Sequence, residues 1–186
     1  MADERLRADA RRNRARVLEV AAEVFATEGF SVPVAEIARR AGVGTGTVSR
    51  HFPTKEDLVA AIVGSRLTEL TIKADELARR EDPGTAFFAL FIAFVRAGAE
   101  DCGLAEVAGD DRRLDELDER AGADLCGRLQ ELLAAAQKAG AVRPDVSYAD
   151  VRALMSACMT RKDGLEPILG VVTDGLSTDK HALSTP

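Results

Sequence analysis

The sequence predicts an all-α protein of about nine helices, and two observations support this fold class. Apolar residues recur every three or four positions along most of the 186 residues, which is the spacing that one buried helix face requires. Alanine and leucine are abundant, whereas aromatic residues make up 4% and tryptophan is absent, a composition that favours helices over sandwiches or barrels. No segment has the pattern of a convincing strand.

The first helix is expected over about 9–28. Apolar residues from Leu18 to Phe25 follow the i, i+3, i+4, i+7 spacing of an amphipathic helix. Gly29 follows directly, at the position where glycine commonly ends a helix because it adopts a left-handed conformation without strain. This segment is expected to bury one face in a core.

Two short helices separated by a glycine turn come next. Pro33 can begin the first, over 34–41, because the backbone N–H that proline lacks would have no partner there. Gly42 ends this helix. After the turn, Thr45 is expected to cap a second short helix that runs to about residue 51.

Six further helices complete the expected chain. Thr54, with Asp57 three residues on, approximates a capping box and predicts the start of a long helix over about 55–80. The other five helices are expected at about 84–100, 103–109, 111–139, 147–162 and 165–177. Gly122 is the candidate position for a bend within the helix over 111–139.

The longest uninterrupted apolar run has only ten residues, 86–95. A membrane-spanning helix needs about 20, so no membrane contact is expected, and a helix apolar on every face is expected to be enclosed by others. The N-terminus lacks the apolar block of a secretory signal, so the cytoplasm is the expected compartment.

Charge is distributed unevenly along the chain. The net charge of −6 at pH 7, taken alone, argues against a nucleic-acid binder. Residues 1–60, however, hold ten basic and nine acidic residues, whereas the remainder holds fifteen basic and twenty-two acidic ones. Six arginines lie between positions 5 and 16, which indicates either an arm that meets a polyanion or a solvated chain end.

The sequence has few residues suited to bind a metal or to form a disulfide. The three cysteines, Cys102, Cys126 and Cys158, are widely spaced and form no CxxC pair, and the two histidines, His51 and His181, lie far apart. No metal and no cofactor are therefore expected. Cys126 and Cys158 fall in apolar helix stripes and are interpreted as small buried residues. Cys102, in a break between helices, is expected to be more exposed, and thiol sensing is the alternative role for a cysteine here.

The stretch AGVGTGTVSRHF, residues 41–52, carries the functional prediction. A short helix, a glycine turn and a second short helix form a helix-turn-helix unit, in which the second helix can enter a DNA major groove. Its outer side chains are small and polar, as such an approach requires. Lys55, at the start of the next helix, is expected to pair with a phosphate.

Two successive segments, RVLEVAAEVFATEGF and VAEIARRAGVGTGTVSRHFPTKEDLVAAI, resemble the DNA-binding domain of TetR-family (tetracycline-repressor-like) transcriptional regulators. The resemblance spans about residues 13–63. The residues that carry it are, in order, Phe25, Gly29, Phe30, Ile37, Ala38, Ala41, Gly42, Val43, Gly46, Thr47, His51, Phe52, Lys55, Glu56 and Leu58. Such an ordered series is far more specific than a bare helix-turn-helix.

Two positions depart from the family pattern. Ser49 stands where the family usually has a tyrosine that contacts a phosphate, and Pro33 stands where it commonly has a capping hydroxyl. The residues expected to contact DNA are Thr45, Gly46, Thr47, Ser49, Arg50, His51, Lys55, Arg12 and Arg14. For His51, structural packing is an equal alternative.

The resemblance implies an all-helical homodimer whose C-terminal domain holds a small effector that relieves repression. The expected domains are a DNA-binding domain over 1–54, an effector-binding and dimerisation domain over 55–177, and a polar tail over 178–186. Dimerisation is expected through the helices over 147–162 and 165–177. The candidate pocket residues are Phe87, Phe88, Phe91, Phe94, Leu104, Leu125, Leu129, Met155 and Met159. Core packing is the alternative for the phenylalanines.

The sequence therefore predicts a regulator, most simply a repressor, that binds a palindromic operator and is released by a largely apolar effector. A DNA-binding regulator that senses no ligand is the first alternative, and activation in place of repression is a second. An enzyme that uses the C-terminal cavity is the third. It is disfavoured because residues 81–186 show neither a nucleophile beside a base nor a glycine-rich phosphate loop.

Overall fold

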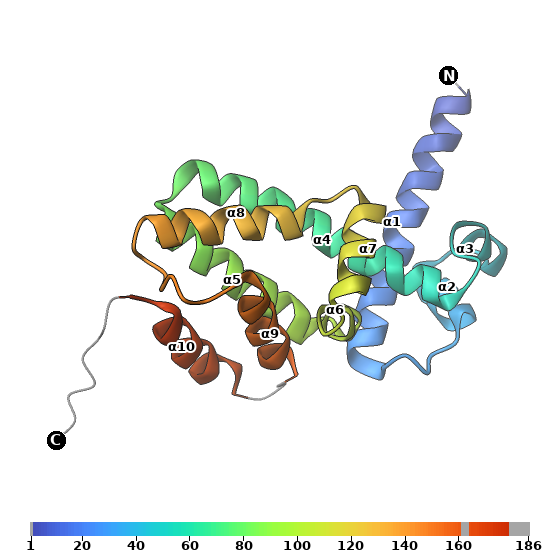
Figure 1. The fold of residues 1–186 in the computed structure, drawn as a ribbon. Coiled ribbons are helices and arrows are strands. Elements are labelled where there is room, and N and C mark those ends of the chain that lie inside the picture. The colour runs from blue at the N-terminus through green and yellow to red at the C-terminus, as the bar shows by residue number, and fades with distance from the viewer. Residues whose placement is uncertain (1, 161–163, 179–186) are drawn as a thin grey trace. The chain divides into compact units, whose positions relative to one another are not determined.

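A computed structural model describes residues 2–160 and 164–178 of the chain. Within these residues it contains ten α-helices and, as its only β-type pairing, one isolated antiparallel bridge between Val142 and Ser177 (Figure 1). The predicted all-α class is confirmed. The chain divides into two compact units, a smaller unit of residues 1–63 with 101–103 and a larger unit of residues 64–100 with 104–186.

The smaller unit contains α1 (Ala2–Glu28), α2 (Val34–Ala41), α3 (Thr45–His51) and the first turns of α4 (Lys55–Arg80). Helix α1 packs against both α2 and α3, and α2 packs against α3. The core of this unit consists of Val17, Ala21, Val24, Phe25, Val32, Ile37, Ala38, Ala41, Val48, Phe52, Leu58 and Ile62. The first helix begins at residue 2, seven residues earlier than predicted.

Local signals set most helix ends in the smaller unit. Gly29 and Gly42 adopt the left-handed conformation, with φ of 77° and 68°, as helix-ending glycines do. The capping box of α4 is present: the Asp57 N–H donates to Thr54 Oγ1 at 3.0 Å, and the Thr54 N–H donates to Asp57 Oδ2 at 3.2 Å. The predicted cap of α3 is wrong, because Gly44 occupies that position and Thr45 is already the first helical residue.

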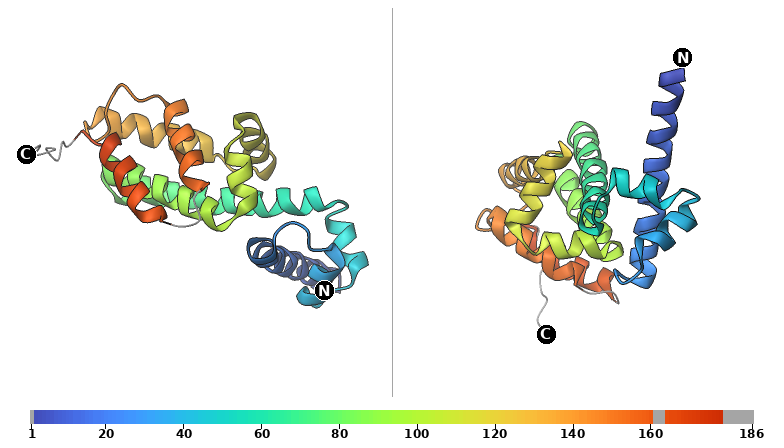
Figure 2. Two further views of the ribbon diagram at one scale, coloured as in Figure 1. Left: turned by 90° about the horizontal axis from the view of Figure 1, so that it is seen from below. Right: turned by 90° about the vertical axis from the view of Figure 1, so that its right-hand side faces the viewer.

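The larger unit contains the rest of α4, most of α6 and five further helices. These are α5 (Pro83–Glu100), α6 (Cys102–Ala108), α7 (Asp111–Ala121), α8 (Leu125–Lys138), α9 (Tyr148–Met159) and α10 (Leu165–Leu176). Helix α5 packs against α8 and α9, and α9 packs against α10; these helices lie side by side in Figure 2. Among the described residues, α5 alone is long and apolar enough to cross a membrane. Its phenylalanines Phe87, Phe91 and Phe94 are buried in the protein.

One predicted helix, over 111–139, is two helices in the structure. Gly122 adopts a left-handed conformation with φ of 63°, which ends α7 where only a bend was expected. The buried carboxylate of Asp118 then accepts hydrogen bonds from the Leu125 N–H at 3.2 Å and the Cys126 N–H at 3.0 Å, which satisfies two of the free donors at the start of α8. The described chain consequently has ten helices, where about nine were predicted.

Candidate nucleic-acid interface and ligand cavity

Helices α2 and α3 form a helix-turn-helix unit in the smaller unit. The turn begins at Gly42, and the Val43 N–H donates to the Ala38 carbonyl at 3.0 Å, which closes the end of α2. Gly44 then leads into α3. The Val48 side chain of α3 and the Phe52 ring just after it are buried in the core, so one side of α3 is fixed inwards and the opposite side faces outwards.

The outward side of α3 carries the predicted DNA-contacting residues. Thr45, Gly46, Ser49, Arg50 and His51 are exposed, and Thr47 is half-buried. Their shared property is that they are polar or lack a side chain, so the helix presents hydroxyls, a guanidinium and an imidazole to solvent. The structure thus brings six of the nine predicted DNA-contacting residues together on one short helix.

Gly46 is notable within this surface. A Cβ atom built at Gly46 would meet no atom of the protein within 4 Å, and its backbone is not in the left-handed region. Nothing inside the protein therefore requires glycine here, although glycine weakens a helix relative to alanine. Because glycine has no side chain, an exposed glycine in a helix lets the backbone of another molecule approach this surface closely.

Helix α1 carries the predicted basic residues, and its N-terminal part extends beyond α2 and α3 (Figure 1). Arg12 is exposed and pairs with Asp9 one turn earlier. The Arg14 guanidinium lies over the Phe52 ring, 5.3 Å from its centroid. Arg16, which the sequence analysis did not select, reaches the glycine turn, where Nη2 lies 3.9 Å from a Cβ built at Gly42. The arm expected from the charge pattern is a helix.

Lys55 lies at the start of α4, but its ammonium group points into the smaller unit. Nζ donates to the carbonyl of Phe30 and, at 2.9 Å, to that of Val32, and it lies 5.5 Å from the centroid of the Phe25 ring. The group thereby holds the loop between α1 and α2. An ammonium has three N–H donors, so two are engaged with the protein and one is left over. The predicted phosphate contact of Lys55 stays a prediction.

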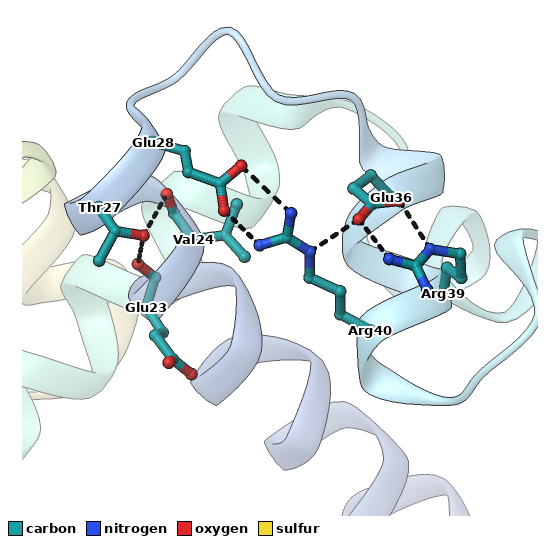
Figure 3. Close-up of polar contacts among 7 residues, drawn as sticks. All are labelled: Glu23, Val24, Thr27, Glu28, Glu36, Arg39 and Arg40. Carbon is teal, nitrogen blue, oxygen red and sulfur yellow. Dashed lines mark hydrogen bonds and ion pairs between the residues drawn. The ribbon is translucent and has the colours of Figure 1, made fainter.

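An ion network braces α2 against the end of α1 (Figure 3). Arg40 Nε donates to Glu36 Oε1 at 2.7 Å, and its two Nη groups donate to Glu28 on α1. Arg39 donates two hydrogen bonds to the Glu36 carboxylate, from Nε to Oε2 at 2.8 Å and from Nη2 to Oε1 at 2.7 Å. The Arg39 hydrogen bonds, then those of Arg40, lower the pKa of Glu36 to about 2, and Arg40 lowers the pKa of Glu28. Two arginines and two glutamates thus neutralise one another where α2 meets the end of α1.

A small cavity lies inside the larger unit. Its volume open to the centre of a water molecule is about 10 Å³, which is room for one water. Four predicted pocket residues, Phe94, Leu125, Leu129 and Met155, line it. Of the other candidates, Phe87, Phe91 and Leu104 are fully buried in the core, Phe88 is half-buried, and Met159 packs against Gly98.

The remaining lining residues are ones that the sequence analysis did not select as pocket residues. They are Ala108, Leu114, Cys126, Tyr148 and Arg152. Tyr148 and Arg152 lie at i and i+4 of α9 and share a face with Met155 at i+7, which is the one sequence signal that could have identified them. Burial raises the pKa of the Cys126 thiol to about 12, so this cysteine stays a neutral thiol and is a poor redox sensor.

Two family profiles match the sequence. The profile described as bacterial regulatory proteins, tetR family, matches residues 17–62 and so covers the helix-turn-helix. The profile described as transcriptional regulator SbtR-like, C-terminal domain, matches residues 82–178, which is more than half of the chain.

Individual proteins with a similar sequence or fold are likewise described as transcriptional regulators. A crystal structure of a TetR transcription regulatory protein from Mycobacterium vanbaalenii is 47% identical, covers 92% of this chain and 99% of its own, and has a TM-score of 0.68. A TetR transcriptional regulator from Streptomyces coelicolor is 28% identical over 88% and 98% of the two chains, with a TM-score of 0.65. An HTH-type transcriptional regulator of Staphylococcus aureus is 39% identical over 59 residues; the match spans about a third of its length.

Proposed function

The chain belongs to the TetR family of bacterial regulatory proteins, and we propose on that premise that it is a sequence-specific DNA-binding regulator of transcription. The observation that carries the proposal is the exposed polar face of α3, fixed from behind by Val48 and Phe52. A rigid helix with small polar side chains can enter a major groove and place donors against base edges. The regulator acts as a repressor in the cytoplasm.

Within this interface, each residue has a proposed part. Thr45, Thr47 and Arg50 read base edges, and Ser49 makes a shorter phosphate contact than a tyrosine would. The α1 arginines Arg12 and Arg14 contact the phosphate backbone. Base contacts determine sequence specificity, whereas phosphate contacts only position the protein on the duplex. Substitutions of Thr45, Thr47 or Arg50 are therefore expected to change the preferred sequence, and substitutions of Arg12 or Arg14 to weaken binding to all duplexes alike.

Selection of bound duplexes from a random pool tests the proposal. The full chain is expected to enrich a palindrome whose half-sites lie about one helical turn or a multiple of it apart. Thr47→Ala is expected to change or flatten the preference within each half-site. Lys138→Ala, at an exposed position in the last turn of α8, is the matched control and is expected to leave the preferred sequence unchanged. No enrichment by the wild type would contradict the proposal.

The proposed active form is a homodimer through α9 and α10. These helices pack against each other, and Val171 of α10 is 73% exposed, the most exposed large apolar residue among the described ones. Ala153 and Ala157 on α9 are exposed and small, which lets a second pair of helices approach closely. Four helices of two copies would then form an isologous bundle, and its two-fold symmetry matches a palindromic operator.

Sedimentation at micromolar concentration tests the dimer. The wild type is expected to sediment as a dimer and Val171→Glu as a monomer, because the substitution places two charges in an apolar interface. Ile72→Glu on α4 is the matched control, since Ile72 is the other large apolar residue that is strongly exposed, at 57%. A dimeric Val171→Glu variant would place the interface elsewhere.

Release from DNA is proposed to follow binding of a largely apolar effector in the cavity of the larger unit. A ligand can shift DNA affinity only if it binds the DNA-free form more tightly than the DNA-bound form. A thermal-shift screen detects such an effector, because the melting temperature rises with ligand concentration relative to its dissociation constant. A compound that raises the melting temperature but leaves operator affinity unchanged is a ligand without being an effector.

A further inference from the structure

Gly46 and Arg50 form the outermost part of α3. Val48 is fully buried, and each of the two residues lies two positions away from it, which is about 160° round an α-helix. They are four positions apart and are therefore neighbours on one face. A Cβ atom built at Gly46 meets no protein atom within 4 Å, so the Arg50 side chain does not fill the space above the glycine. This space is open to another molecule, and Arg50 lies beside it.

The Arg50 guanidinium keeps its hydrogen-bond donors for another molecule. The side chain is exposed and forms no hydrogen bond or ion pair with any residue that the structure describes. By contrast, the two arginines of α2, Arg39 and Arg40, are held by glutamates of their own unit (Figure 3). A guanidinium is always charged at neutral pH and presents its N–H groups as a rigid planar fork. Within α2 and α3, Arg50 is therefore the arginine that is available to an external acceptor.

The other side chains of α3 restrict which bases this surface can distinguish. Adenine is read by a bidentate Asn or Gln, and the amino group of cytosine pairs with Asp or Glu. None of these four residue types occurs over residues 45–51. The hydroxyls of Thr45, Thr47 and Ser49 can contact more than one base and discriminate less. Arg50 alone can form a bidentate pair with a base, and the base that fits a guanidinium is guanine, through its N7 and O6 acceptors.

We propose that Arg50 carries the strongest base discrimination of this protein, through a bidentate pair with one guanine in each half-site. The inference rests on the proposed DNA-binding function and adds the base that is read. Two N–H groups of Arg50 donate to N7 and O6 of the guanine, while the open space at Gly46 lets the edge of that base pair approach the helix backbone. Adenine is rejected because its amino group, a donor, takes the place of O6.

A single-atom change in the DNA tests this pair. 7-Deazaguanine has a C–H group in place of N7, so it lacks one of the two acceptors but still pairs with cytosine. The operator selected by the full chain is prepared with 7-deazaguanine at one guanine of one half-site at a time. Fluorescence anisotropy then gives the dissociation constant of each duplex, and the measured quantity is its ratio to that of the unmodified operator.

One guanine of the half-site is expected to give a ratio of about fivefold or more with the wild type, since a hydrogen bond to a charged donor is lost. Arg50→Ala is expected to bind the unmodified operator more weakly and to lower the ratio at this guanine to about one. Arg12→Ala is the matched control, because it removes the same charge from another exposed position, on α1. It is expected to weaken both duplexes alike and to keep the wild-type ratio, as loss of a phosphate contact does.

Two results would overturn the inference. One is a selected half-site with no guanine at which 7-deazaguanine weakens binding, and the other is a sensitivity to 7-deazaguanine that Arg50→Ala retains. In both cases the wild type still enriches a palindrome, so the proposed function stands and only the role of Arg50 is refuted. If the wild type enriches no duplex at all, the proposed function is refuted and the inference falls with it.

Discussion

Replacing Gly46 by alanine is expected to stabilise the protein and at the same time to weaken its binding to DNA. Gly46 lies in α3 with helical backbone geometry, and an added Cβ meets no protein atom within 4 Å. The methyl group therefore costs nothing inside the protein. It projects instead from the surface proposed to lie in the major groove, where it occupies space that DNA requires.

The two effects have opposite signs and can be sized separately. Alanine at an exposed helical position is more favourable than glycine by about 0.5–1 kcal/mol. For a chain of this length 1 kcal/mol corresponds to about 2–4 °C in melting temperature, so a rise of about 1–4 °C is expected. A methyl group forced into a closely packed interface costs about 1–3 kcal/mol, which weakens operator affinity about 5- to 150-fold.

Calorimetric melting of the free protein and fluorescence anisotropy with the selected operator measure the two effects. Thr68→Ala on α4 is the matched control, because it also raises helix propensity at an exposed position, but in the larger unit. It is expected to stabilise the protein without changing DNA affinity. A Gly46→Ala variant that is more stable and binds the operator as tightly as the wild type would refute the close approach of DNA to α3.

Three further predictions concern charged residues of the smaller unit. Lys55→Met is expected to lower the free energy of unfolding in urea by about 1–2 kcal/mol, since two backbone carbonyls lose a charged donor; unchanged stability would show that the ammonium does not hold the loop. Arg12→Ala is expected to reduce the slope of log affinity against log salt by about one unit, whereas Arg79→Ala leaves it unchanged. Glu36→Gln is expected to lower the melting temperature at pH 7. The pKa of Glu36 in the folded protein lies near 2, below the ordinary 4.5. The deficit in melting temperature of the variant relative to the wild type therefore shrinks as the pH falls from 4.5 towards 2. A deficit independent of pH would contradict the ion network.

Signals within a few residues of one another were sufficient to predict most helix ends of the smaller unit. Gly29 and Gly42 end helices, and Thr54 and Asp57 form their capping box, because each of these depends on local backbone geometry. The break between α7 and α8 was missed in part because Asp118 reaches the N–H groups of residues seven and eight positions later. Helical periodicity continues through such a break and does not reveal it.

Contacts across long sequence distances could not be predicted. Lys55 was expected to face a phosphate, but its nearest acceptors are carbonyls 25 and 23 residues earlier in the chain. Likewise, four of the nine pocket candidates line the cavity, since apolarity alone does not distinguish a cavity wall from the core.

The near balance of charge in the smaller unit bears on how such a protein would find its target in a chromosome. Arg39 and Arg40 are neutralised by glutamates of their own unit, and residues 1–60 carry only one more basic than acidic residue. Attraction to arbitrary duplex grows with the number of phosphates neutralised, so this unit is held weakly by random sequence. Few copies are then sequestered on the rest of the genome, and a small cellular pool suffices to occupy a single regulatory locus.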